Sequence, residues 1–247
     1  TGILGDNGAG KSTLIKIIAG LHQQSEGELF VDGKPTTFSS PAEALGKGIA
    51  TVYQNLAVVP LMPVWRNFFL GQELRKKTFP FSLDANAMRA TTLSELSKMG
   101  IDLPDVDVPI GSLSGGQKQC VAIARAVAGV REATSTLDLV LHVAGLLHDK
   151  ELQPEKKLDD VAPEHLARSF RVNATGPLLV AKHVHPLLRH ERKAVLATLS
   201  ARVGSIGDNR LGGWYGYRAS KAAQNMVVRT VAVELARKAK NAIVMAL

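Results

Sequence analysis

Along the whole chain, short apolar runs alternate with stretches in which apolar residues have helical spacing. This pattern predicts strands that alternate with helices. In the first half, TGIL, GELFV and GIATVYQN have the short apolar runs of strands. The dipeptide Asp32-Gly33 after the second of them predicts a hairpin turn. Helical spacing is found over four ranges: 11–21, 64–77, 85–100 and 112–129.

The second half repeats this alternation. The continuous apolar run within 137–145 predicts a fully buried strand, and two more strands are predicted within 193–204 and 241–247. Long helical patterns cover 163–189 and 219–240. Strands that alternate with helices predict an α/β fold with parallel sheets.

Composition sets the limits of this picture. The 247 residues, 45% of them hydrophobic, place the chain between one large domain and two small ones. The single cysteine, Cys120, excludes an internal disulfide framework and indicates a cytoplasmic protein. No signal peptide is visible, and no apolar run reaches the roughly 18 residues that cross a bilayer.

The net charge of +8 is concentrated in the second half. Residues 1–128 contain 12 Lys+Arg and 11 Asp+Glu, whereas residues 129–247 contain 18 and 11. The basic residues are scattered through helical stretches without interleaved aromatics. Solvated helix faces and an anionic cofactor explain this pattern better than nucleic acid, which is not an expected partner.

The sequence GDNGAGKST at 5–13 matches the phosphate-loop pattern G-x-x-x-x-G-K-[ST] through Gly5, Gly10, Lys11 and Ser12. The backbone N–H groups of such a loop point at phosphate oxygens, and the next helix presents its positive end to the same anion. Lys11 would reach the β- and γ-phosphates, and the Ser12 hydroxyl would hold Mg²⁺. The segment therefore predicts binding of ATP with Mg²⁺.

Two more motifs follow in order: Gln54 after a predicted strand, and SLSGGQKQ at 112–119. Together with the phosphate loop they resemble the ATP-binding subunit of an ABC transporter, and residues 52–71 resemble the subfamily that imports simple sugars. The resemblance implies a P-loop NTPase-like fold, a membrane permease and a second ATPase subunit as partners, and a peripheral place at the inner face of the cell membrane. Gln54 would contact Mg²⁺ and the attacking water. The signature residues would cap a nucleotide held by the partner subunit. The implied nucleotide-binding residues are Gly5, Asn7, Gly8, Gly10, Lys11, Ser12, Thr13, Gln54, Ser114, Gly115 and Gly116, with Ser12 and Gln54 on Mg²⁺.

The resemblance breaks off after the signature helix. In that family a buried strand follows and ends in Asp-Glu, where the Asp orders Mg²⁺ and the Glu positions the attacking water. Here the nearest apolar run, LVLH, ends in His142, which cannot replace a carboxylate pair. Impaired hydrolysis of ATP is therefore expected.

From about residue 130 onward the chain resembles a short-chain dehydrogenase/reductase that lacks its first βαβ unit and Gly-rich turn. The segment HVAG at 142–145 stands where that family has Asn-Asn-Ala-Gly, and Asn173 matches its helix asparagine. Tyr217 and Lys221 have the Y-x-x-x-K spacing, which puts both side chains on one helical face. The resemblance implies a Rossmann-like half that uses NADP or NAD. Lys221 would lower the pKa of Tyr217, which exchanges a proton with a substrate carbonyl.

The serine that polarises the carbonyl in this family falls on Ala201. Ser200 or Ser205 could replace it, and Ser200 is favoured. The wording of this region resembles the carbonyl-reductase branch close to the C-signal and sniffer proteins. The predicted catalytic residues are Asn173, Ser200, Tyr217 and Lys221.

These observations predict a seam at 128–131 between two incomplete segments, 1–128 and 129–247, whose strands could share one hybrid sheet. The leading hypothesis is an ABC-type ATP-binding module with impaired hydrolysis, fused to a truncated reductase segment. One alternative is an NAD(P)H-dependent carbonyl reductase. Another is a chimeric or mis-assembled reading frame with no selected function.

Overall fold

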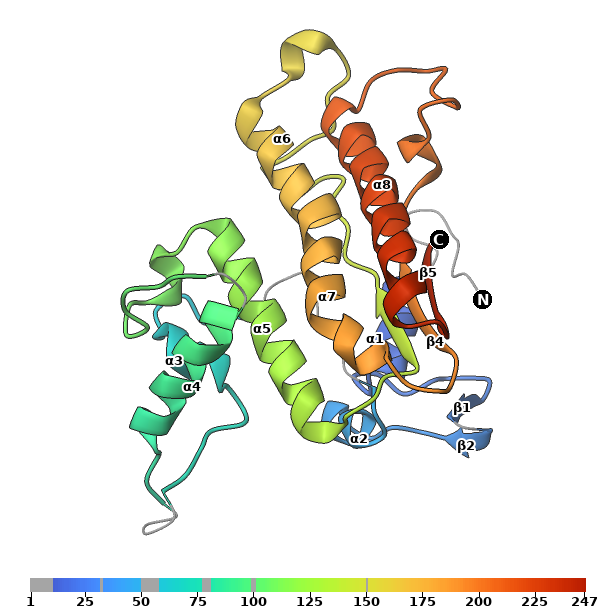
Figure 1. Ribbon diagram of the computed structural model, residues 1–247. Helices are drawn as coiled ribbons and strands as arrows, with labels where there is room; N and C mark the ends of the chain where they lie inside the picture. Colours follow the sequence, from blue (N-terminus) through green and yellow to red (C-terminus); the bar gives the residue numbers. More distant parts are fainter. Residues whose placement is uncertain (1–10, 32, 50–57, 77–80, 99–100, 150) are drawn as a thin grey trace.

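The computed structural model has a mixed α/β architecture and describes residues 11–31, 33–49, 58–76, 81–98, 101–149 and 151–247 (Figure 1). The predicted strand TGIL and most of GIATVYQN lie outside the described residues. The remaining predicted elements are all present in some form, and each is described below with its observed bounds.

The chain enters the described part through helix α1, Lys11–Ile18. The predicted hairpin is confirmed: β1, Leu29–Val31, pairs antiparallel with β2, Lys34–Thr36. Gly33, in the turn, has φ +74°, a left-handed conformation that glycine adopts without strain. Helix α2, Pro41–Gly46, follows.

A helical layer comes next. It consists of α3, Val64–Phe68; α4, Ala85–Lys98; the 3₁₀ turn η1, Ile110–Ser112; and α5, Gly115–Ala133. The helix predicted over 64–77 is much shorter than expected. The chain leaves the helix after Phe68, and the left-handed backbone at Gly71, φ +82°, completes the turn away from it.

The second half contains one sheet and the helices that cover it. Its elements are β3, Leu139–His142; η2, Leu158–Asp160; α6, Pro163–Phe170; the π-helical turn η3, Arg171–Thr175; α7, Gly176–Val184; η4, His185–Leu188; β4, Ala194–Thr198; η5, Arg202–Gly204; α8, Tyr215–Lys238; and β5, Ala242–Ala246. The strands pair in parallel in the order β3-β4-β5. Helices α7 and α8 pack on this sheet, as the α/β pattern predicts.

The prediction that the first of these strands is fully buried was wrong. Leu139 in β3 is 62% exposed, and the other three residues of the strand are only partly buried. The physical reason is that β3 lies at an edge of the sheet, whereas β4 lies between two neighbours.

The hybrid sheet is also not formed by the described strands. β1 and β2 pair only with each other, and the three-stranded sheet takes all of its strands from the second half. The parallel strands are connected by helical crossovers within the second half. Helices α6 and α7 connect β3 to β4, and α8 connects β4 to β5.

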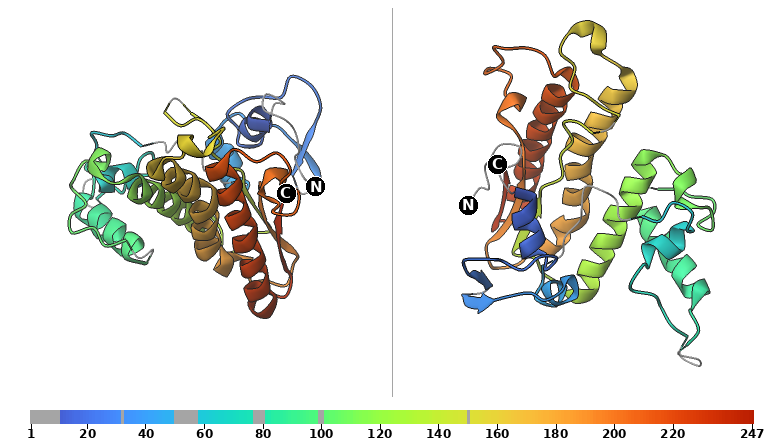
Figure 2. Two further views of the ribbon diagram at one scale, coloured as in Figure 1. Left: turned by 90° about the horizontal axis from the view of Figure 1, so that it is seen from above. Right: turned by 180° about the vertical axis from the view of Figure 1, so that it is seen from behind.

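Helix α5 joins the two halves. It packs on α3 and α4 on one side and on α7 on the other, and both views from above and from behind show it between them (Figure 2). Its apolar residues at successive positions, Val121 to Ala124, are each at most 4% exposed. A single buried cluster therefore runs from Val64 through α5 to Leu235. The predicted seam at 128–131 falls inside this continuous helix.

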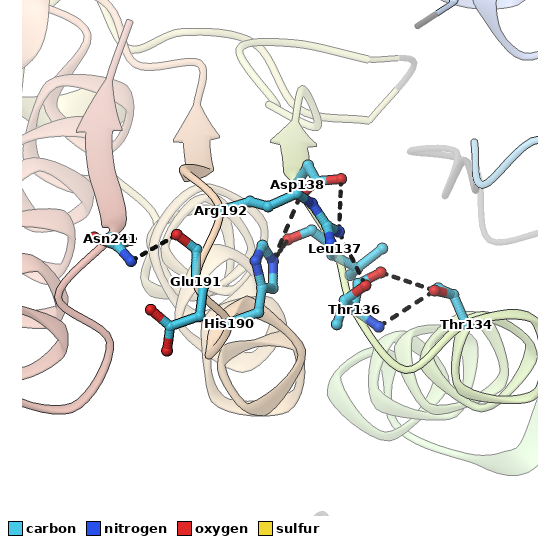
Figure 3. A network of polar contacts seen from close by, with 8 residues as sticks. All are labelled: Thr134, Thr136, Leu137, Asp138, His190, Glu191, Arg192 and Asn241. Carbon is cyan, nitrogen blue, oxygen red and sulfur yellow. Dashed lines mark hydrogen bonds and ion pairs between the residues drawn. The ribbon is translucent and has the colours of Figure 1, made fainter.

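A polar network fixes the connection from α5 into β3 (Figure 3). Thr134, which ends α5, exchanges hydrogen bonds with Thr136 across a tight turn, at 2.9 and 3.2 Å. The Arg192 guanidinium binds both carboxylate oxygens of Asp138, at 2.9 and 3.1 Å. His190 Nε2 lies 2.9 Å from the Leu137 carbonyl oxygen. The first residues after α5 are thus held to the segment that leads into β4.

We expect the two halves of the protein to unfold as one cooperative unit, because α5 contributes to the core of both. Replacing the buried Ile123 with Ala should lower the free energy of unfolding by about 2–5 kcal/mol. Trp65 in α3 and Trp214 before α8 report on the two halves, so denaturant titrations of the Trp65→Phe and Trp214→Phe proteins should have coincident midpoints that shift together.

The matched control is Glu132→Ala, an exposed position on the same helix, which should leave the midpoints nearly unchanged. A shift of only the Trp65 transition would contradict the shared core.

Candidate functional site

Most of the predicted phosphate cradle falls on Gly5, Asn7, Gly8, Gly10 and Gln54, which lie outside the described residues. Helix α1, Lys11–Ile18, directly follows the predicted loop in the sequence. The side chains of Lys11 and Ser12 are likewise outside the described part, and Thr13 is exposed in the first turn. The nucleotide site at this end of α1 therefore stays a prediction.

The signature motif forms the capped N-terminus of α5. The Ser114 hydroxyl accepts a hydrogen bond from the backbone N–H of Gln117, at 3.3 Å. The Gln117 side chain accepts one in return from the Ser114 N–H, at 2.9 Å, which completes a capping box. This pairing explains why a serine followed three residues later by a glutamine begins the helix here.

The two glycines of the motif face the C-terminal half. A Cβ atom on Gly115 would collide with the Arg171 guanidinium, and one on Gly116 would lie 3.6 Å from Arg171 Nε. A cation from η3 thus lies against the face that the resemblance assigns to a nucleotide of a partner subunit. That role of Ser114, Gly115 and Gly116 stays a prediction.

Asn173 lies in the π-helical turn η3 and is fully buried. Its Oδ1 accepts from the Leu146 N–H at 2.7 Å, and its Nδ2 donates to the Leu146 carbonyl oxygen at 2.9 Å. Nδ2 also donates to Ser220 Oγ at 2.9 Å. Asn173 therefore ties the segment after β3 to α8, and its amide is satisfied by protein groups.

Tyr217 and Lys221 share one face of α8, as predicted from their spacing. The Lys221 ammonium lies 5.8 Å from the centroid of the Tyr217 ring. Burial raises the pKa of Tyr217. The lowering of this pKa by Lys221 stays a prediction. Burial also lowers the pKa of Lys221 to about 8. The ammonium group is nevertheless well supplied with hydrogen-bond acceptors.

Lys221 Nζ donates to the Leu199 carbonyl oxygen and to Gln224 Oε1, both at 2.8 Å. Gln224 Nε2 donates in turn to Thr198 Oγ1 at 2.5 Å and to the Leu199 oxygen at 3.0 Å. The sequence analysis missed Gln224 and Thr198. The available signal was the i, i+3 spacing that places Gln224 on the same helical face as Lys221.

His142 continues this buried network at the end of β3. Its Nδ1 lies 3.3 Å from Thr198 Oγ1. Burial, followed by the nearby charge of Lys221, lowers the pKa of His142 to about 4. The imidazole is therefore neutral near pH 7 and adds no charge at the position where the ATPase resemblance requires carboxylates.

The two serine candidates lie apart from this network. Ser200 Oγ donates to Asn225 Oδ1 at 2.6 Å, which ties the end of β4 to α8. Ser205 follows η5 and is exposed. The choice between them as the carbonyl-polarising group stays a prediction, although the recorded partner of the favoured Ser200 is Asn225.

Glu155 is the one acidic residue buried within the described part of the chain. Its carboxylate accepts from the Gly216 N–H at 3.2 Å, and its backbone oxygen accepts from the Trp214 N–H. A carboxylate at this place caps the positive end of α8, next to Tyr217. The described ranges contain no helix that could cross a membrane and no group of three potential metal ligands.

Two family models match the chain. The model for ABC transporters matches residues 1–133, and the model for enoyl-(acyl carrier protein) reductases matches residues 118–244. The two matches overlap at residues 118–133, which are all but the first three residues of α5.

The curated relatives are similar to the N-terminal half. The xylose/arabinose import ATP-binding protein of Sulfolobus acidocaldarius is 46% identical over 125 residues, which cover 51% of this chain and 49% of the relative. The fructose import ATP-binding protein of Rhizobium meliloti is 43% identical over 162 residues, with 57% of this chain and 62% of the relative covered. The chain thus spans about half the length of these relatives.

The solved structures that match are similar to about half of the chain. They include Sniffer of Caenorhabditis elegans (29% identity, TM-score 0.44; 51% of this chain and 56% of that one). The NADPH-bound carbonyl reductase from chicken fatty liver has 26% identity and a TM-score of 0.44, with 51% of each chain covered.

We expect His142 to make stability depend on pH. The folded pKa of about 4 lies below the unfolded value of 6.5, so the unfolded state binds more protons between these two pH values. The stability that the neutral imidazole contributes is fully present above about pH 6.5. It is lost as the pH falls toward 4, by an amount on the order of a few kcal/mol.

Denaturant titrations at pH 7, 5.5 and 4.5 would measure this. In His142→Asn, which keeps a polar side chain without a titrating ring, the difference from the original chain should change across this window. A constant difference would contradict the buried, neutral state of His142. His183, whose pKa is also lowered by burial, is common to both proteins and cancels.

Proposed function

Because residues 1–133 belong to the ABC transporter family and residues 118–244 to the enoyl-(acyl carrier protein) reductase family, we propose that this chain binds Mg·ATP through its N-terminal half and hydrolyses it slowly. The observation that carries the proposal is a phosphate loop and a signature motif that lie in the expected order within the family match.

Binding would use the residues of the phosphate loop. The backbone N–H groups from Gly5 to Ser12 and the positive end of α1 would hold the phosphates, with Lys11 on the β- and γ-phosphates. The Ser12 hydroxyl and Gln54 suit Mg²⁺, which prefers oxygen ligands. When bound, the ion would neutralise charge on the phosphates.

Slow hydrolysis follows from the strand after the signature helix. That strand is β3, and it ends in His142 instead of an acidic pair. A neutral imidazole, buried against Thr198, has no free carboxylate oxygen to orient Mg²⁺ or a water molecule. The buried acid of the described part, Glu155, caps α8 instead.

The finer assignment is sugar import. The relatives that resemble the N-terminal half are named as import proteins for xylose/arabinose and fructose. We extend this role to the present chain: an ATP-binding partner of a membrane permease at the inner, cytoplasmic face of the cell membrane, together with a second ATPase subunit.

We expect Lys11→Ala to weaken ATP binding by about 10- to 100-fold, because a charge-assisted hydrogen bond to phosphate contributes roughly 1.5–3 kcal/mol. A titration of the full chain with Mg·ATP, followed by calorimetry, would measure the change. Lys16→Ala, which removes an exposed lysine from the same helix, is the matched control and should bind like the original chain. Equal affinities of the Lys11→Ala protein and the original chain would overturn the proposal.

A second candidate function, reduction of carbonyl compounds with NADPH or NADH, is favoured by the shared face of Tyr217 and Lys221 on α8. The residues present do not fit the nicotinamide cofactor in this arrangement. Lys221 is 2% exposed, and its ammonium is bound to Leu199 and Gln224. The family serine is replaced by Ala201, and Ser200 is paired with Asn225. ATP binding is therefore the better supported function.

We expect the original chain to show no oxidation of NADPH or NADH with a small aldehyde, because Lys221 is turned inward. Absorbance at the nicotinamide band would follow the reaction. A rate that is lost in Tyr217→Phe but kept in Tyr215→Phe, at a neighbouring position of α8, would establish the reductase function instead.

A further inference from the structure

Lys221 is a buried cation held by neutral groups. It is 2% exposed, and no carboxylate in the described ranges forms an ion pair with it. A buried ammonium without a counter-charge is costly unless its N–H groups are well satisfied. The positions of the hydrogen-bond acceptors therefore determine where the Lys221 ammonium lies.

The Gln224 amide is one of these acceptors, and its orientation is fixed. The side chain is fully buried, with Oε1 toward Lys221 Nζ and Nε2 toward Thr198 Oγ1 and the Leu199 oxygen. If the amide were flipped, its NH₂ group would face the ammonium and its oxygen would face the Leu199 carbonyl. A donor would then face a donor at Lys221, and an acceptor would face an acceptor at Leu199. Only the observed orientation therefore satisfies the network.

Thr198 anchors the amide from the strand side. Its place at the end of β4 is set by the parallel register with β3 and β5, and its hydroxyl is also within 3.3 Å of His142 Nδ1. The acceptor for Lys221 is therefore tied to the backbone of the sheet. The titratable side chains that face the ammonium are Tyr217 on α8 and His142 on β3.

We propose that Gln224 is a positioning residue whose amide holds the Lys221 ammonium inward, against the end of β4, and so keeps it away from the solvent beside Tyr217. Removing the amide would release the ammonium toward solvent. The proposal does not depend on ATP binding by the N-terminal half, so either can fail without the other.

The first test replaces Gln224 with Leu in the full chain. The pKa of Lys221 is followed by NMR of ε-¹³C-labelled lysine, with the signal assigned by its loss in Lys221→Met. Release toward solvent should raise the pKa from about 8 toward the ordinary value of about 10.4. Modification of Lys221 by methyl acetimidate, located by peptide mass spectrometry, should become at least about tenfold faster as its exposure rises. A pKa below that of the original chain, with slow modification, would mean that Lys221 stays inside with one acceptor fewer and would overturn the proposal.

The second test uses Gln224→Glu, which keeps the length of the side chain and its acceptor for Lys221 but loses the donor to the Leu199 oxygen. A carboxylate in contact with the ammonium should raise the pKa of Lys221 by about 1–3 units. Because the acceptor that holds the Lys221 ammonium is kept, modification of Lys221 should stay as slow as in the original chain. Rapid modification of Lys221 in this variant would contradict the positioning role.

Asn225→Leu is the matched control, because it removes an amide from the next position of the same helix, whose recorded partner is Ser200. It should change neither the pKa nor the modification rate of Lys221. If it changed both as Gln224→Leu does, the effect would come from general disturbance of α8, and the specific role of Gln224 would be refuted.

Discussion

The burial of α5 on two opposite sides is the interaction on which the structure depends. Apolar side chains at four successive positions, Val121 to Ala124, surround the helix axis in this turn, so this part of α5 must be covered on more than one side. Helices α3 and α4 cover one side and α7 covers the other. Each half by itself would leave part of this surface exposed, so the ATPase-like and reductase-like segments complete each other's core.

The short connection after α5 leads directly into β3, the first strand of the three-stranded sheet. Thr134 and Thr136 form the turn, and Asp138 is held by Arg192 from the segment before β4. The parallel pairing of β3 with β4 follows directly. One edge of the sheet is therefore β3, the strand that follows an ATPase-type helix, and its first residue remains exposed. Within the described residues, the two families are joined at the level of a helix and a strand edge, and no sheet combines strands of both halves.

Internal satisfaction of polar groups has consequences for function in both halves. The Asn173 amide is hydrogen-bonded to Leu146 and Ser220. The Lys221 ammonium is hydrogen-bonded to Leu199 and Gln224. Arg171 lies on the glycines of the signature motif. The residues that resemble family site residues are present, but in this fold they hold protein elements together. The predicted phosphate loop, which precedes α1 in the sequence, remains the candidate for ligand binding.

The sequence by itself determined the α/β alternation, the hairpin at Gly33, the long helices and the order of the motifs, because these depend on local spacing and turn chemistry. It also determined that Tyr217 and Lys221 share a helical face, since i, i+4 spacing is a property of one helix. Only the tertiary structure decided that β3 is an edge among the described strands, that these strands form two separate sheets and that α5 spans the seam. It also decided the state of Lys221, because Thr198 and the Leu199 carbonyl lie more than twenty residues away along the chain. Packing determines which residues distant in sequence become neighbours and hydrogen-bond acceptors. The periodicity of residues along the chain carries no information about this packing.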